Sequence, residues 1–66
     1  MPVINIDLGL SQTSESQRKQ LISRITADAV EITGISPEKF TMFVNEIPLE
    51  NIGVGGKTIK EIKAGL

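Results

Sequence analysis

The sequence predicts an α/β fold, a single βαβ unit followed by a glycine-rich hairpin. Residues 2–8 alternate between apolar and polar side chains, which is typical of a half-buried strand. Residues 15–33 repeat apolar side chains at helical spacing, and residues 40–46 form a second strand-like run. The order strand, helix, strand favours a right-handed crossover that leaves the two strands parallel.

The first predicted strand has one apolar face, formed by Ile4, Ile6 and Leu8. Pro2 fits the first position of a strand, where a missing N–H group costs least. Residues 9–13 are expected to form the loop that follows.

The predicted helix has a recognisable start and stop. Ser14 and Gln17 match a capping box, in which each side chain bonds to the backbone of the other residue. Gly34 is suited to the left-handed position that ends many helices. The apolar stripe consists of Leu21, Ile22, Ile25, Ala29 and Ile32.

The second predicted strand is apolar on both faces. Ser36-Pro37 before it is typical of a helix start, but there is room for only one short turn. The strand places Phe40, Met42 and Val44 on one face and Phe43 on the other. Such a strand is normally covered on both sides, and in so small a chain we expect the second cover to be another subunit.

The segment after the second strand contains three glycines within residues 53–56, which predicts a tight turn or hairpin. Gly55-Gly56-Lys57-Thr58 also invites comparison with a phosphate-binding loop. That motif requires an earlier glycine where this chain has Asn51, and a full helix after it. Only eight residues follow Thr58, so a glycine turn is the better interpretation.

Size and composition favour a small protein that associates with itself. Residues 1–66 are expected to form one domain, and a chain this short is marginally stable alone. The absence of cysteine and histidine removes disulfides and the usual zinc ligands. No Asp/Glu cluster has metal-ligand spacing, so no metal or other cofactor is predicted. Oligomerisation is the remaining source of stability.

Charge and hydropathy exclude several partners. The net charge of −1 and the scarcity of aromatic residues argue against nucleic-acid binding. No apolar run is long enough to span a membrane, and the N-terminus lacks the pattern of a signal peptide. We therefore expect a soluble cytoplasmic protein.

Acid–base chemistry without histidine must use carboxylates, lysines or the N-terminus. Asp7 and Glu46 are interpreted as structural or solvated carboxylates. If Met1 is removed, the Pro2 nitrogen becomes a secondary amine that can take up a proton. An apolar pocket or a nearby cation would lower the pKa of that amine and suit it to act as a base.

These features together resemble the 4-oxalocrotonate tautomerase family of the tautomerase superfamily, over essentially the whole chain. The resemblance rests on the chain length, Met1-Pro2 with its Val-Ile-x-Ile strand, Gln17, Leu21-Ile22, Thr33-Gly34, Val44-x-Glu46 and Asn51-Ile52-Gly53-Val54-Gly55-Gly56. It implies dimers with a four-stranded sheet that assemble into hexamers. It further implies an isomerase that uses the processed N-terminal proline as a general base on a small enol or α-keto acid, without a cofactor.

The resemblance also indicates substrate-binding positions, where this chain departs from the family. Gln12 and Thr41 stand where the family has carboxylate-binding arginines, and Ile52 replaces an aromatic residue. Leu8 is a further candidate for the substrate pocket. The loop is one residue longer than in the family, so Ser11 or Thr13 is an alternative to Gln12.

The missing arginines predict weak or no activity on a dicarboxylate such as 2-hydroxymuconate. Neutral side chains offer hydrogen bonds of roughly half the strength of charge-assisted ones, and losing two cations raises the pKa expected for the Pro2 amine. A basic residue from a neighbouring subunit could substitute; the candidates are Arg18, Lys19, Arg24 and Lys57. Arg18 and Lys19 are themselves expected to be solvent-exposed.

Two other functions stay open at this point. A protonated Pro2 amine could act as an acid in hydration or dehalogenation of an unsaturated acid. Alternatively, the chain could be a non-catalytic subunit, such as the arginine-poor half of a hetero-oligomer.

Overall fold

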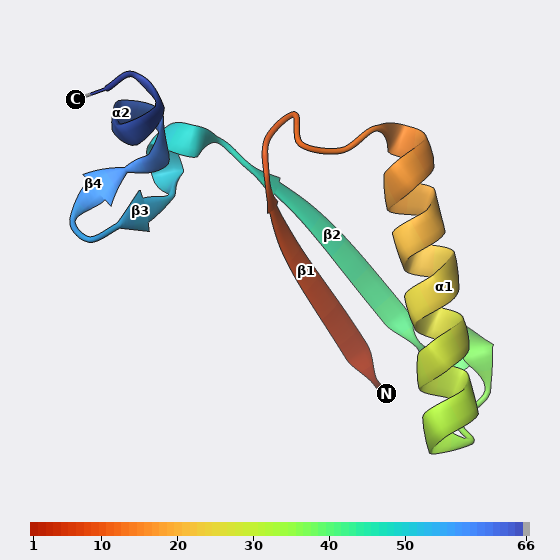
Figure 1. The fold of residues 1–66 in the computed structure, drawn as a ribbon. Coiled ribbons are helices and arrows are strands. Elements are labelled where there is room, and N and C mark those ends of the chain that lie inside the picture. Colours follow the sequence, from red (N-terminus) through yellow and green to blue (C-terminus); the bar gives the residue numbers. More distant parts are fainter. Residues whose placement is uncertain (66) are drawn as a thin grey trace.

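Two parts of unequal size make up the chain, a βαβ body and a C-terminal arm that extends away from it (Figure 1). The computed structural model describes residues 1–65. The body contains β1 (Val3–Gly9), α1 (Glu15–Thr33), the 3-10 turn η1 (Pro37–Lys39) and β2 (Thr41–Ile47). The arm contains the 3-10 turn η2 (Leu49–Asn51), β3 (Gly53–Val54), β4 (Lys57–Thr58) and α2 (Ile59–Lys63). The predicted βαβ unit and hairpin are thus confirmed.

The body's sheet has two parallel strands, as predicted, in a register that pairs Val3 with Thr41 and Gly9 with Ile47. Both strands begin one residue later than the sequence suggested. Phe40 still belongs to the turn before β2, because its backbone N–H donates to the carbonyl of Pro37 at 3.1 Å. Because Phe40 is the C-cap of η1, the ladder starts at Thr41.

Helix α1 has the predicted ends. The Gln17 backbone N–H donates to Ser14 Oγ at 3.1 Å, and the Ser14 N–H donates to Gln17 Oε1 at 2.9 Å, which completes the capping box. Gly34 adopts a φ of 73°, a left-handed conformation that glycine tolerates without strain. The helix runs along one face of the sheet (Figure 1). Half-buried Ile4, Ile6 and Leu8 alternate with exposed residues along β1.

Arg18 corrects the expectation that it is solvent-exposed. It is half-buried, and its guanidinium donates to the Thr13 carbonyl at 2.7 Å and to Thr13 Oγ1 at 3.2 Å. The same nitrogen lies 3.4 Å from a carboxylate oxygen of Glu46. Arg18 therefore ties the start of α1 to the end of β2, and Glu46 has the structural role predicted for it.

The arm is built from local contacts. Gly55 and Gly56 form the hairpin turn with φ of 61° and 87°, a region in which other residues are strained. Helix α2 was not predicted, although the sequence carries its signal. Thr58 and Glu61 form a second capping box, with Glu61 N–H to Thr58 Oγ1 at 3.0 Å.

One protomer does not build a core of its own. None of the described residues is fully buried, and the radius of gyration is 15.3 Å, whereas a compact domain of this length has about 11 Å. The sheet face away from α1 carries apolar side chains, with Phe43 at 51% and Val3 at 47% exposure. Within residues 1–65, no helix has the length and apolarity needed to cross a bilayer.

Candidate active site

Pro2 lies at the open end of the sheet, directly before β1. Its carbonyl accepts a hydrogen bond from the Thr41 backbone N–H at 3.0 Å. This bond extends the ladder by one step and brings together two of the predicted site residues, Pro2 and Thr41. Met1 is 92% exposed, so it is accessible to a processing peptidase.

Gln12 and Leu8 lie at the opposite end of β1. The six residues from Pro2 to Leu8 span about 20 Å of extended chain. Gln12 folds back on its own loop: its side-chain oxygen accepts from the Gly9 N–H at 3.2 Å, and its backbone N–H donates to the Gly9 carbonyl at 3.3 Å. Its side-chain NH₂ group is left to donate to a ligand.

Ile52 belongs to the arm and is separate from both groups. It is half-buried, and its carbonyl accepts from the Ile59 N–H at 2.8 Å. Ile52 thereby links the end of η2 to the start of α2. The five predicted site residues thus occupy three places in one protomer, and only Pro2 and Thr41 are neighbours.

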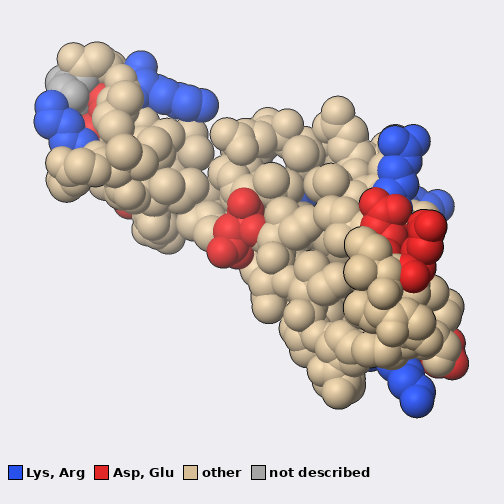
Figure 2. All heavy atoms as spheres, turned by 60° about the horizontal axis from the view of Figure 1, so that its bottom comes forward, with Lys and Arg blue, Asp and Glu red and all other residues tan. Residues whose placement is uncertain are grey.

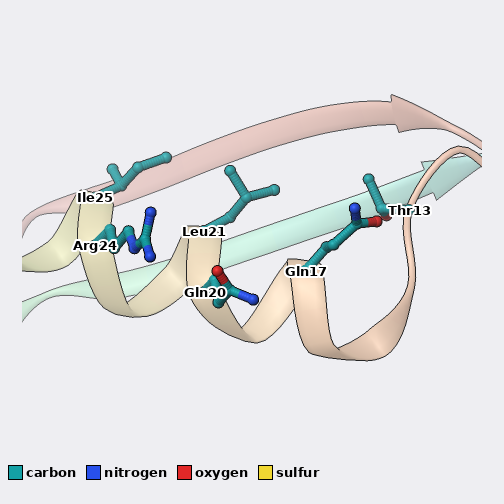
Figure 3. Close-up of a pocket in the computed structure, with 6 residues that line it drawn as sticks. All are labelled: Thr13, Gln17, Gln20, Leu21, Arg24 and Ile25. Carbon is teal, nitrogen blue, oxygen red and sulfur yellow. The ribbon is translucent and has the colours of Figure 1, made fainter.

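Two hollows flank α1, and both are lined by basic residues named as substitutes for the missing arginines. The first has a volume of about 340 Å³ and is lined by Thr13, Gln17, Gln20, Leu21, Arg24 and Ile25 (Figure 3). The second, of about 480 Å³, is lined by Glu15, Arg18, Lys19, Ile22, Ser23 and Val44. Pro2 lines neither hollow, so neither is the proline site within one protomer.

The charged side chains form no continuous basic surface on the face of the molecule that Figure 2 shows. On the face shown in Figure 2, Lys and Arg side chains lie in small groups, several of them beside Asp and Glu. The prediction against nucleic-acid binding stays a prediction, since nothing bound is present to test it.

Sequence reasoning overlooked Lys39. The position that matches the family's second-strand arginine is Thr41, and Lys39 lies outside that match. The structure places Lys39 at the end of η1, two residues before Thr41 and at the same end of the sheet as Pro2. The signal was present in the sequence, as the only basic residue between the helix and the second strand.

Comparison with known proteins identifies the class to which this fold and this proline belong. A sequence model described as "Tautomerase enzyme" matches residues 2–62. The chain belongs to the tautomerase family, whose members are isomerases, as the resemblance implied.

Individual relatives are similar to this chain in sequence or fold over nearly its full length. A probable tautomerase K2 of Dickeya dadantii is 31% identical over 61 residues, 92% of this chain and 91% of that protein. A 2-hydroxymuconate tautomerase of Comamonas testosteroni is 32% identical over 62 residues, 94% and 97% of the two chains. The crystal structure of TomN, a 4-oxalocrotonate tautomerase homologue of the tomaymycin biosynthetic pathway, superposes with a TM-score of 0.85 at 32% identity. That superposition covers 96% of this chain and 95% of TomN.

Proposed function

We propose that this protein is a keto–enol tautomerase in which the Pro2 amine, freed by removal of Met1, acts as the general base. The observation that carries the proposal is the position of Pro2. Its carbonyl is held by Thr41 at the start of the sheet, while Met1 stands out in solvent. Its nitrogen therefore becomes a positioned amine once Met1 is removed. Membership of the tautomerase family supports the same reaction class.

The reaction needs only one proton carrier. The neutral amine takes the proton from the enol hydroxyl, and the electron pair left behind forms the carbonyl. The conjugated double bonds shift, and the protonated amine returns a proton to the carbon at their far end, so the enzyme ends unchanged. Thr41 and Gln12 can donate neutral hydrogen bonds to the substrate, and Leu8 and Ile52 supply apolar walls.

We further propose that residues 1–66 form one domain whose working unit is an oligomer. A protomer with no fully buried residue among those described lacks the core that a stable domain needs. A second copy that runs antiparallel would extend the two-stranded sheet to four strands. It would also bring the Leu8 and Gln12 end of one copy to the Pro2 end of the other. Three such dimers would make the hexamer that the resemblance implies.

Substitution of Pro2 tests the proposed base. After mass spectrometry has shown that Met1 is absent, Pro2→Ala should lower kcat by roughly 10²–10⁴-fold on an enol substrate. Because Pro2 contributes no N–H to the ladder, the oligomer should stay intact by light scattering. A preparation that retains Met1 is the matched control and should be inactive, because its Pro2 nitrogen is an amide. Activity unchanged in Pro2→Ala would overturn the proposal.

A hydratase or dehalogenase that uses Pro2 as an acid is the second candidate, favoured by the neutral residues at positions 12 and 41. Without those cations the amine holds its proton more firmly. The pH dependence of kcat/KM separates the two. A Pro2 base gains activity as the pH rises through its pKa, whereas a Pro2 acid loses it.

A non-catalytic subunit is the third candidate, favoured by the same two neutral positions. It predicts that a second short tautomerase-like chain co-purifies from the native source, and that the isolated chain turns over no enol. Turnover by the isolated chain that depends on Pro2 excludes it.

A further inference from the structure

We propose that Lys39 binds the substrate carboxylate beside Pro2, so that the site selects enols that carry a single carboxylate. This inference rests on the proposed function, because it assigns a substrate class to the same Pro2 site. Lys39 is the one cation of the βαβ body that the fold places at the Pro2 end of the sheet.

The parallel ladder brings Lys39 close to Pro2. Lys39 ends η1 two residues before Thr41, whose N–H bonds to the Pro2 carbonyl at 3.0 Å. Two Cα–Cα steps of about 3.8 Å and one inter-strand spacing of about 4.8 Å put the Lys39 and Pro2 Cα atoms within roughly 12 Å. A lysine on its four-carbon stem and a small substrate together fill that distance.

Lys39 is held in place by its backbone while its charge stays available. Its N–H donates to the Ser36 carbonyl at 3.1 Å, and Pro37 fixes the first position of the same turn. The side chain is exposed and has no ion-pair partner in the described part of the chain, although Glu38 is its neighbour in sequence. The ammonium group is therefore available to an anionic ligand.

The other cations of the body are placed elsewhere. Arg18 is paired with Glu46 at the far end of β2, and Lys19 and Arg24 line the hollows beside α1. Within one protomer, Lys39 is the one cation of the body near Pro2, so a protomer by itself can neutralise one carboxylate there. A second carboxylate would lose its water without gaining a counter-charge, which is unfavourable.

The test compares an acid with its own ester. Phenylenolpyruvate carries one carboxylate, and its methyl ester has the same enol without the charge. For the acid, Lys39→Gln should raise KM about tenfold, the lower end expected for a hydrogen bond to a charged group, and leave kcat nearly unchanged. For the ester, KM should not change. Lys39→Arg should keep the wild-type KM for the acid, and Lys60→Gln, at an exposed lysine of α2, is the matched control that should change nothing.

Several outcomes would overturn the role of Lys39. These are an equal effect of Lys39→Gln on acid and ester, no effect on either, the same effect from Lys60→Gln, or wild-type protein that turns over neither compound. Pro2→Ala is measured in the same assay to separate this inference from the proposed function. If turnover is lost in Pro2→Ala but unchanged in Lys39→Gln, only the role of Lys39 is wrong. If turnover is unchanged in Pro2→Ala, the proposed base is wrong.

Discussion

The body and the arm are stabilised in different ways, although both contain two strands, a helix and a capping box. In the body, a ladder of seven residue pairs joins segments nearly forty residues apart in sequence. The Arg18–Glu46 ion pair and the hydrogen bond from Asn45 Nδ2 to Asp7 Oδ1 at 3.0 Å add further distant links. In the arm, the ladder has two pairs, and the described contacts join residues close in sequence.

In the proposed oligomer, this difference means that the two regions would depend on other copies of the chain to different degrees. The body has its own long-range framework and leaves one sheet face open at Phe43. The arm has local structure without a core beneath it, and leaves Val54 at 57% and Ile62 at 45% exposure. Both surfaces carry exposed apolar side chains, which suits burial against another subunit.

Charges placed on the two apolar surfaces should have the largest effect. Phe43→Asp should dissociate the proposed oligomer, at a cost on the order of 3 kcal/mol per protomer, because an unpaired charge would replace an apolar ring that the assembly would bury. Val54→Asp in the arm should weaken assembly less. Light scattering and analytical ultracentrifugation report the size of each species.

The control for both variants is Ala27→Asp, which adds the same charge at an exposed position of α1. It should leave the size of the oligomer unchanged. If Phe43→Asp also leaves the size unchanged, the open sheet face is not an interface and the comparison of the two regions fails.

A smaller effect is expected from breaking the link between α1 and β2. Arg18→Met should destabilise the protein by roughly 1 kcal/mol, because both partners are partly exposed, at 25% and 29%, and solvent weakens the pair. Urea denaturation measures the change, and Glu46→Gln should reproduce part of it. A loss of activity without a loss of stability would instead show that Arg18 serves the substrate.

The smallest global effect is expected from the two capping boxes, which offer a matched pair. Ser14→Ala and Thr58→Ala each remove a cap worth about 1 kcal/mol. In the body the loss should lower the melting temperature of the whole protein, because α1 is part of the cooperative unit. In the arm it should appear chiefly as faster hydrogen exchange in α2. Equal changes in melting temperature would mean that the arm unfolds together with the body.

Most of the fold could be predicted because its signals are local. Alternation along β1, the Ser14 and Gln17 pair, and Gly34 each specify a backbone conformation through the residue itself or its near neighbours. Helix α2 was missed although Thr58 and Glu61 give an equally local signal. Helix α2 has only five residues, too few for apolar side chains to repeat at helical spacing over more than one turn. The prediction that Arg18 is solvent-exposed was wrong because its partner, Glu46, comes from a distant segment.

The candidate site was less predictable, since it depends on what the fold brings together. The sequence identified Pro2 as the candidate base from its position behind Met1 and from the family resemblance. It could not show that Gln12 folds back on Gly9, or that Leu8 and Gln12 lie a full strand away from Pro2. Lys39 was overlooked because its proximity to Pro2 arises only from the pairing of β1 with β2.

By itself, the sequence determined the order of the βαβ elements and the hairpin, the ends of α1 and the family, because periodicity, caps and glycine turns act over a few residues. Only the tertiary structure decided which side chains share an end of the sheet and which surfaces stay open. The parallel register fixed Thr41 beside Pro2, brought Lys39 near and left Phe43 uncovered. These are relations between distant segments, and a register shift of one residue would turn every strand side chain to the other face.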